Sequence, residues 1–380
     1  VVEAVRARAA EHGGLHDPRD DPRVRQLHVP NVLHLGVTSD RAPRDSAVAA
    51  IVPLPRELLS SRPKMKISPS LMWGAEDGES GGFRFNFGGD ADAAAAKAPN
   101  PDVAARAPDA DPKEGGHIAG VEVLASTVPE HSPSWKPETL ELDPSTTVVK
   151  GAVTSADAAN ALRDADGSIA SQYDVVKGRY EGGFKLWECS VDLAKHLLKH
   201  ADVGDDGDDD AGVKLRGATV LELGCGHGVP GIVAALKGAA QVTLCDYNPE
   251  VLSTLAVPNV RANFTTDEER GKFAYLGGDW GDLDAHIQPG SFDLVLAAET
   301  IYSVDSYARH IRVLRRALRV GTGVALIAAK SYYFGVGGGV DAFRQAIERA
   351  HPDMEVTSVE SFSDGASNVR EILRVRYKRR

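Results

Sequence analysis

Four residues near position 225 have the types and the spacing that a nucleotide-like ligand requires. Glu222 ends an apolar run, and Gly224, Gly226 and Gly228 follow it before another apolar segment begins. Glycines after a strand can adopt positive φ angles and let a ligand lie directly against the backbone. Asp246 ends the next apolar run, about 20 residues downstream, where a carboxylate can accept both hydroxyls of a ribose. These residues predict a strand, a tight turn and a helix that bind a ribose-containing ligand.

The spacing of the glycines separates two classes of ligand. The dinucleotide fingerprint has two residues before its last glycine, whereas the run Glu-Leu-Gly-Cys-Gly-His-Gly (222–228) has one. This run resembles the first motif of the seven-β-strand methyltransferases, which bind S-adenosylmethionine. The resemblance implies an α/β, Rossmann-like fold, S-adenosylmethionine as the cofactor, and no metal ion.

Further polar and aromatic residues at strand ends are candidates for contacts with that cofactor. Tyr247 and Asn248 follow the second strand and are expected to flank the ribose. Asp279 and Trp280 follow the third strand, where a carboxylate can take the adenine amino group and an indole can pack on a ring face. A plain core anchor is the alternative role for Trp280. Glu222 either orients the glycine turn or meets the ammonium group of the ligand through water, and a cap on the next helix is the alternative.

A second segment, residues 180–189 (Tyr-Glu-Gly-Gly-Phe-Lys-Leu-Trp-Glu-Cys), comes before the first strand of the expected sheet. Its glycine pair predicts a turn, and helical spacing predicts a helix over 184–200. Trp187, Glu188 and Cys189 are candidate cofactor contacts, with Trp187 closing over the methionine part. An amphipathic helix with one tryptophan is also typical of a plain core helix.

Alternating apolar patterns predict the elements that position these residues. We expect strands at 219–223, 241–245, 273–276, 292–297 and 323–328, helices at 229–236, 250–263, 306–318 and 340–350, and closing strands at 355–360 and 369–377. Such alternation requires a parallel sheet with helices on both faces. Ligands bind beyond the carboxyl ends of such strands, and the motifs fall there.

Four segments together resemble one family: residues 178–189, 257–263 (Val-Pro-Asn-Val-Arg-Ala-Asn), 299–302 (Glu-Thr-Ile-Tyr) and 332–340 (Tyr-Tyr-Phe-Gly-Val-Gly-Gly-Gly-Val). The Glu-x-x-Tyr pattern is similar to the signature of lysine-type protein methyltransferases of this fold. The full set resembles the protein-histidine N-methyltransferases of the methyltransferase-like group, whose substrate is ribosomal protein three of the large subunit. The resemblance runs from about Lys177 to the C-terminus.

The resemblance implies a methyl transfer to a histidine of a basic, large-subunit ribosomal protein. Tyr302 and Glu299 are the catalytic candidates, because either can hold one imidazole nitrogen so that the other is free to attack. For Glu299, contact with the cofactor or a role in holding its loop is the alternative. Tyr333, Phe334 and Gly337 are expected to form a mobile lip over the substrate, with a plain connector as the alternative. A lysine methyltransferase of the same fold and a non-catalytic module that binds S-adenosylmethionine remain as other interpretations.

Composition divides the chain into three parts. Residues 1–116 are rich in Pro, Ala, Gly and Asp, which predicts a disordered, low-complexity region. Residues 117–176 regain apolar side chains and predict a partly ordered lead-in, and residues 177–380 form the methyltransferase-like domain. The segment Phe-Arg-Phe-Asn-Phe (83–87) resembles the N-terminus of the same family. Because the chain begins with valine, we expect the native start near Met72.

Net charge and cysteine content indicate which partners and which cell compartment suit this protein. A net charge of −11 argues against direct nucleic-acid binding and suits an enzyme that meets a basic protein. The three cysteines lack metal-ligand spacing, which predicts reduced thiols in a cytoplasmic or nuclear protein. No apolar run reaches the ~18 residues of a membrane span. We expect a monomer without membrane contacts, and we expect Lys330, at the end of the fifth strand, to be solvated.

Overall fold

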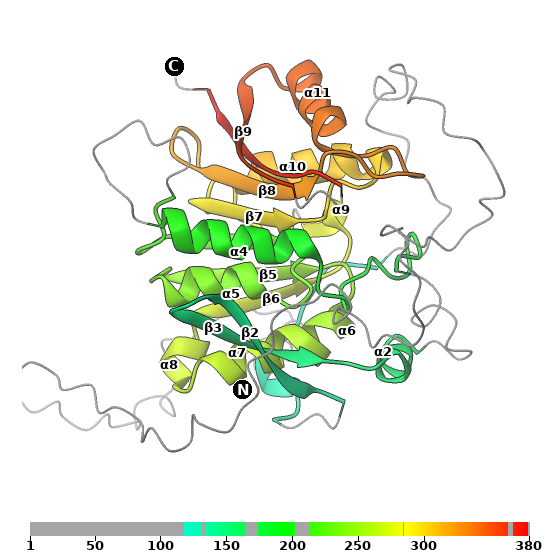
Figure 1. Ribbon diagram of the computed structural model, residues 1–380, viewed down its shortest axis with the longest axis vertical. Helices are drawn as coiled ribbons and strands as arrows, with labels where there is room; N and C mark the ends of the chain where they lie inside the picture. Colours follow the sequence, from blue (N-terminus) through cyan, green and yellow to red (C-terminus); the bar gives the residue numbers. More distant parts are fainter. Residues whose placement is uncertain are drawn as a thin grey trace, which may run out of the picture. The chain divides into compact units, whose positions relative to one another are not determined.

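The computed structural model describes residues 118–130, 134–163, 174–201, 213–283, 285–363 and 368–378. These residues form an eight-stranded, mostly parallel sheet covered by helices on both faces, with a separate two-stranded hairpin beside it (Figure 1). The predicted disordered region 1–116, including the segment 83–87 and the expected start near Met72, lies outside the described residues.

The sheet has the strand order β1-β6-β5-β4-β7-β8-β10-β9. Its parallel strands are β4 (Thr219–Leu223), β5 (Gln241–Asp246), β6 (Phe273–Gly277), β7 (Leu294–Ala298) and β8 (Val324–Lys330). Strand β10 (Arg370–Tyr377) is antiparallel between β8 and β9 (Met354–Phe362), and β1 (Val121–Glu122) is antiparallel to β6. The seven expected strands are confirmed, and β1 extends the sheet.

The order of the strands reverses at β4, which pairs with β5 on one side and β7 on the other. In open parallel sheets this switch point leaves a crevice beyond the carboxyl ends of the two central strands. The predicted α/β methyltransferase-like fold is therefore confirmed, and the switch point lies between the loops that follow β4 and β7.

Helices cover the two faces of the sheet in separate layers. One layer contains α4 (Glu188–His200), α5 (Val229–Leu236), α6 (Pro249–Val251), a π-helical turn (Leu252–Ala256) and α7 (Val257–Asn263). The other contains α9 (Trp280–Leu283), α10 (Tyr307–Ala317) and α11 (Val340–Ala350). Short helices lie at Ser155–Ala161 (α2), Asp267–Arg270 (α8), Ala125–Thr127 and Val304–Ser306. None of these described helices combines the length and the apolar character that crossing a membrane requires.

Successive side chains of the central strands point to opposite faces of the sheet and pack in the two apolar layers. Val220 packs in the layer that holds α4 and α5, whereas Leu221 and Leu223 pack in the layer that holds α10 and α11. Successive side chains of a strand point to opposite faces, so a strand buried on both sides reads as a continuous apolar run. Helix α4 begins at Glu188, later than the expected residue 184, because Trp187 has an extended backbone.

The lead-in is built into the domain through a hairpin of β2 (Lys136–Asp143) and β3 (Thr146–Ala152). The side chain of Asn259 accepts hydrogen bonds from the Trp135 indole (2.8 Å) and from the Gly151 amide (2.6 Å). Asn263 accepts from the Val149 amide (2.9 Å) and donates to its carbonyl (2.6 Å). The Pro-Asn-x-x-x-Asn pattern in the family-like segment 257–263 therefore docks the hairpin.

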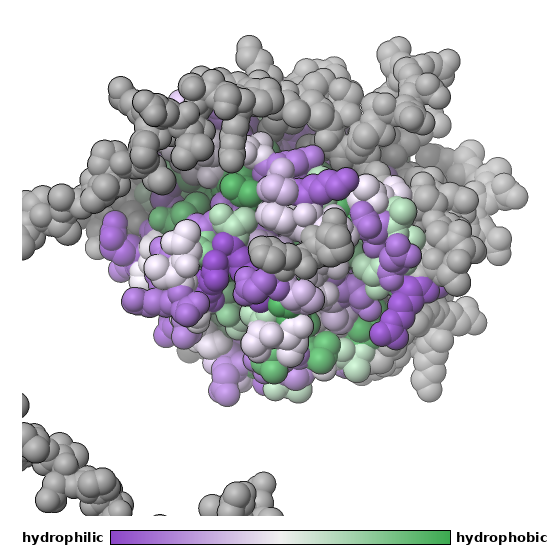
Figure 2. Space-filling model, turned by 90° about the horizontal axis from the view of Figure 1, so that it is seen from below, coloured by the Kyte–Doolittle hydropathy of each residue, from purple (hydrophilic) through white to green (hydrophobic). Residues whose placement is uncertain are grey.

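The side of the molecule on which α8 and the hairpin lie is seen from below in Figure 2. The described residues on this face are mostly hydrophilic, and hydrophobic residues appear in small separate patches. Isolated exposed apolar residues are ordinary on a soluble domain. This face therefore has the character of a solvated surface.

Candidate active site at the carboxyl end of the sheet

The glycine turn after β4 has the backbone that its sequence predicts. Gly224, Gly226 and Gly228 have φ angles of 61°, 51° and 69°, and Gly228 is the N-cap of α5. A Cβ atom on Gly224 would lie 2.8 Å from Cγ2 of Thr300, which follows β7. The loops after β4 and β7 thus touch at the switch point, and side chains at these glycines would be strained or would clash.

Asp246, at the end of β5, is 4% exposed and faces the glycine turn. Its Oδ2 accepts the Gly226 amide (2.9 Å) and its Oδ1 accepts the Asn248 amide (3.1 Å). Burial raises the pKa of this carboxyl to about 6. A carboxylate oxygen has two lone pairs, so each oxygen keeps one for a further donor. This geometry fits the predicted contact with the two hydroxyls of a ribose.

In the structure the Glu222 side chain caps the helix that follows the glycine turn, and the same contact orients the turn. Its Oε2 accepts the Gly231 amide at 2.7 Å, in the first turn of α5. The side chain is 2% exposed, and burial raises its pKa to about 8. Glu222 therefore caps α5 and holds the glycine turn against the helix.

A segment that we name the strap, residues 177–187, crosses the ends of β5 and β7. Asn248 accepts the amide of Glu181 (3.2 Å) and donates to the carbonyl of Arg179 (2.8 Å). The Tyr247 hydroxyl donates to the carbonyl of Gly178 (2.9 Å). Tyr247 and Asn248 were expected to flank the ribose, and in the structure their polar groups hold the strap.

The middle of the strap lies directly on the predicted cofactor residues. A Cβ atom on Gly183 would lie 3.0 Å from Oδ2 of Asp246, so only glycine fits here without displacement. The Nε2 atom of His227, in the glycine turn, lies 3.1 Å from the carbonyl of Phe184. Burial lowers the pKa of His227 to about 3, so the ring is neutral and carries its proton on Nε2, where it donates to Phe184.

Tyr302, a predicted catalytic residue, contacts the strap from the β7 side. Its hydroxyl donates a hydrogen bond to the carboxylate of Glu181. At the start of the strap, Lys177 pairs with Asp305 (2.7 Å). Because Tyr302 is already joined to Glu181, its contribution to substrate chemistry stays a prediction, and its contact with the strap is the role that the geometry displays.

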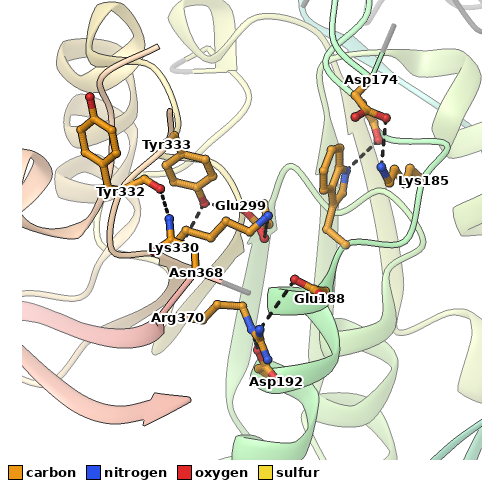
Figure 3. A network of polar contacts seen from close by, with 12 residues as sticks. Asp174, Lys185, Glu188, Asp192, Glu299, Lys330, Tyr332, Tyr333, Asn368 and Arg370 are labelled. Carbon is orange, nitrogen blue, oxygen red and sulfur yellow. Dashed lines mark hydrogen bonds and ion pairs between the residues drawn. The ribbon is translucent and has the colours of Figure 1, made fainter. Parts of the chain in front are cut away.

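Glu299, the other predicted catalytic residue, lies in a cluster with Lys330 and Tyr333 (Figure 3). It follows β7 with a φ angle of 57°, and among the described non-glycine residues only Arg163 shares a positive φ. The Tyr333 hydroxyl donates to Oε2 of Glu299, and Lys330 Nζ lies 3.8 Å from Oε1. Within the described chain, the buried Oε1 atom accepts no hydrogen bond. A strained, buried acceptor of this kind is typical of functional sites.

Trp187 joins the strap to the Glu299 cluster. Its indole donates to the carbonyl of Gly182 (3.0 Å). The ammonium groups of Lys185 and Lys330 lie 4.5 Å and 5.9 Å from the centre of its ring. Cations over an indole face are attracted by the ring quadrupole. Trp187 is therefore placed between the predicted cofactor residues and Glu299.

Glu188 and Cys189 begin α4 beside this cluster. Cys189 is completely buried, and both burial and the neighbouring Glu299 carboxylate raise the pKa of its thiol. Glu188 lies 3.7 Å from Nη1 of Arg370, which also pairs with Asp192 at 2.7 Å (Figure 3). Of the candidates in this segment, Cys189 contacts the Glu299 cluster and Glu188 turns toward β10.

Asp279 and Trp280 lie beyond β6. Asp279 accepts the Gly281 amide (2.7 Å) and pairs with Arg309 (3.4 Å). The ring of Trp280 packs on that of His310, with 4.7 Å between centroids. This packing matches the core-anchor interpretation of Trp280, and the ion pair places the Asp279 carboxylate against α10.

The glycine-rich run after β8 differs from the expected lip. Tyr333 is 0% exposed, so it cannot face a substrate as part of a mobile surface loop, and this expectation is wrong for that residue. Phe334 is 73% exposed, and Gly337 is partly exposed with a φ angle of 77°. A Cβ atom on Gly338 would lie 2.2 Å from the carbonyl oxygen of Tyr302. The run is a tight turn that packs against the Glu-x-x-Tyr segment, with only Phe334 projecting.

The sequence interpretation missed two contributors to the site. Lys330 was expected to be solvated, yet it is 4% exposed and points toward Glu299. Glu181 was not singled out, although its carboxylate accepts from Tyr302. A charged residue at a strand end is the only sequence signal for Lys330, and such residues usually reach solvent. The contacts across the sheet edge decided both placements.

The strand order, the antiparallel last strand, the glycine turn and the buried acid after β5 define a methyltransferase fold. Residues 176–333 match a family model described as lysine methyltransferase. A histidine protein methyltransferase 1 homolog of Dictyostelium discoideum is 38% identical over 210 residues, which are 55% of this chain and 62% of the relative. The homolog of Bos taurus is 33% identical over 223 residues, or 52% of this chain and 56% of the relative.

The chain thus spans between half and two thirds of the length of these curated relatives. The sequence comparisons confirm the resemblance to the protein-histidine methyltransferases. Among solved structures, the magnesium protoporphyrin IX methyltransferase of Synechocystis superposes with a TM-score of 0.36 and 16% identity, covering 49% of this chain and 81% of that one.

Proposed function

We propose that the chain is an S-adenosylmethionine-dependent protein methyltransferase that methylates a histidine side chain of a basic, large-subunit ribosomal protein. The relatives named histidine protein methyltransferase support the reaction class. The observation that carries the proposal is the buried Glu299 carboxylate. Tyr333 holds one of its oxygens, while the other, Oε1, faces the Lys330 ammonium at 3.8 Å and makes no hydrogen bond of normal geometry with the described residues.

The residues at the switch point fit the proposed cofactor. Asp246 would accept the ribose hydroxyls with the lone pairs that its backbone contacts leave open. Gly224, Gly226 and Gly228 would lie against the ligand without side chains in the way. Trp187, at the end of the strap, would cover the methionine part. When bound, S-adenosylmethionine supplies a methyl group made electrophilic by its sulfonium.

The protein must then present one imidazole nitrogen with a free lone pair. A neutral imidazole has one N–H and one lone pair, and the hydrogen bond at the N–H decides which nitrogen is which. Oε1 of Glu299 would accept that N–H, so that the opposite nitrogen points at the methyl group. As the ring becomes cationic, the same carboxylate stabilises the developing charge. Lys330, 3.8 Å from Oε1, limits the excess negative charge before substrate binds.

Methylation of a lysine is the second candidate, because the matched family model is described as lysine methyltransferase. A lysine amine must first lose a proton, since its usual pKa is about 10.4. Glu299 could accept a hydrogen bond from the amine as well. The two candidates differ in the methylated amino acid rather than in the fold or the cofactor.

The same proposal includes a monomeric enzyme of the cytoplasm or nucleus. All three cysteines are buried and unpaired, which supports a reducing compartment. A protein substrate is favoured over nucleic acid by the net charge of −11, which would attract a basic partner.

The test is methylation of ribosomal proteins from cells that lack the activity, with tritiated S-adenosylmethionine and the full chain. The labelled protein is hydrolysed and the methylated amino acid identified, with Glu299→Gln as a comparison. We expect methylhistidine in one large-subunit protein, and much weaker labelling by Glu299→Gln. Methyl-lysine would overturn the histidine assignment. Absence of label, with the cofactor bound, would overturn catalysis in favour of a binding module.

A further inference from the structure

A cluster of two histidines and one glutamate lies outside the candidate active site. His196 and His200 are on α4, and Glu360 is on β9. One nitrogen of each histidine and one oxygen of Glu360 all lie within 4.8 Å of one another. The two histidines are four residues apart, so their rings lie on the same face of the helix, with 4.5 Å between centroids.

His196 is the buried centre of this cluster. It is 1% exposed, and its Nδ1 lies 2.5 Å from Oε2 of Glu360. Its Nε2 is buried and has no hydrogen-bond partner in the part of the chain that the structure describes. Leaving a buried polar atom without a partner costs about 1–3 kcal/mol.

We propose that His196, His200 and Glu360 bind a divalent transition-metal ion, with Zn²⁺ the best match. Two imidazoles and one carboxylate form a donor set that Zn²⁺ uses, with the fourth position left to water. Harder ions such as Mg²⁺ and Ca²⁺ prefer oxygen ligands. Ligand atoms of Zn²⁺ lie about 2.0–2.2 Å from the ion, so shifts of about 1 Å would bring this set to tetrahedral geometry.

Lys199 provides a way to recognise binding at this cluster. Its ammonium lies 3.0 Å from Oε1 of Glu360 and its side chain is mostly exposed. A cation that binds Glu360 must compete with this ammonium, since both are attracted by the same carboxylate. The Lys199 side chain can swing into solvent at little cost. Removal of the lysine charge should therefore strengthen metal binding.

A bound ion would fasten α4 to β9. The first turn of α4 carries Glu188 and Cys189, and β10, the neighbour of β9, carries Arg370, which pairs with Glu188. The ion would thus stabilise the wall of the candidate active site from outside. The inference depends only on the cluster geometry, and it stands whether or not the chain transfers methyl groups to histidine.

The experiment is calorimetric titration of the untagged, chelator-treated full chain with Zn²⁺, together with the change in Tm on Zn²⁺ addition. We expect one ion per chain and a rise in Tm, because a ligand that binds only the folded state stabilises it. His200→Ala and Glu360→Gln should each weaken Zn²⁺ binding by roughly 10-fold or more, since even outer partners of a metal ligand contribute 10–100-fold.

Two further variants make the result specific. Lys199→Gln should bind Zn²⁺ more tightly than the wild type, and His351→Ala, which removes a histidine outside the cluster, should bind it equally well. A site elsewhere in the chain would leave His200→Ala and Glu360→Gln with wild-type affinity. That outcome, or no Zn²⁺ bound by the wild type, would overturn the proposal.

Discussion

The hydroxyl group of Tyr333 donates a hydrogen bond to Oε2 of Glu299, although 34 residues separate them in the chain. Tyr333 lies three residues beyond β8 and Glu299 directly follows β7, so the bond joins the ends of two parallel strands. The same hydroxyl accepts the Lys330 amide at 3.2 Å. One side of the Glu299 carboxylate is thereby fixed, and Oε1, the other oxygen, lies 3.8 Å from the Lys330 ammonium.

Replacement of Tyr333 by Phe should lower kcat for methyl transfer by roughly 10-fold, which corresponds to about 1.4 kcal/mol. The reason is that Glu299 loses the donor that sets its orientation. Cofactor affinity should keep its wild-type value. Steady-state kinetics and calorimetric titration measure the two quantities, and Tyr332→Phe, at the neighbouring tyrosine, serves as the control. An unchanged kcat would show that the bond is only structural.

Replacement of Tyr302 by Phe should lower turnover without abolishing cofactor binding. The substitution removes the hydrogen bond to Glu181 and so loosens the strap at its β7 side. Glu181→Gln weakens the same contact, so the double variant should lose little more than either single variant, as expected for two residues that act through one bond. Additive losses would indicate that Tyr302 has a separate role with the substrate, and unchanged turnover would exclude any role.

Replacement of Asp246 by Asn should weaken S-adenosylmethionine binding by roughly 10- to 100-fold. A hydrogen bond to a charged group contributes about 1.5–3 kcal/mol, and the amide presents only one acceptor oxygen to the two hydroxyls. Calorimetric titration measures the dissociation constant. Asp279→Asn is the matched control, because Asp279 already pairs with Arg309 and should contribute less. Equal losses in the two variants would contradict the assignment of the ribose contact to Asp246.

Glu222 should make the stability of the fold depend on pH. Burial raises its pKa from 4.5 to about 8, so its neutral form is favoured by folding. The resulting stabilisation is fully present below about pH 4.5 and is lost as the pH rises through about 8. We therefore expect the free energy of unfolding of the wild type to fall more steeply from pH 5 to pH 8 than that of Glu222→Gln.

Urea denaturation at a series of pH values measures this difference. The lowered pKa values of His227 and His310, both about 3, act in the opposite direction, because unfolding lets these rings gain protons below about pH 6.5. The wild type and Glu222→Gln share that effect. The difference between their free energies of unfolding at each pH therefore reports the contribution of Glu222 alone. Parallel curves would mean that Glu222 is charged in the folded protein.

Replacement of Asn259 by Ala should lower the free energy of unfolding by about 3 kcal/mol. This fully buried side chain accepts from Trp135 and Gly151 and donates to the His227 carbonyl (2.9 Å), so the substitution leaves several buried groups without partners. Thr147→Ala, on the exposed surface of the same hairpin, should change stability little. A small loss for Asn259→Ala would show that apolar packing alone docks the hairpin.

Local sequence patterns determined the sheet and the glycine turn of this protein. The apolar runs that end at Glu222 and Asp246 are strands buried on both faces, and such runs leave little choice of structure. The expected positive φ angles at Gly224, Gly226 and Gly228 followed from the same turn. Period and residue type are local properties, so a single sequence is enough to predict them.

The tertiary structure alone decided how the side chains at the strand ends are used. Tyr333 became buried, Trp280 packed on the ring of His310, and Lys330 turned toward Glu299 instead of solvent. Each outcome depends on partners far away in the chain, such as the strap over Asp246 and the pairing of β7 with β8. The local sequence places a side chain at the edge of the sheet. Its burial and its hydrogen-bond partners depend on which distant segments pack there, because those segments exclude water and supply the opposing polar atoms.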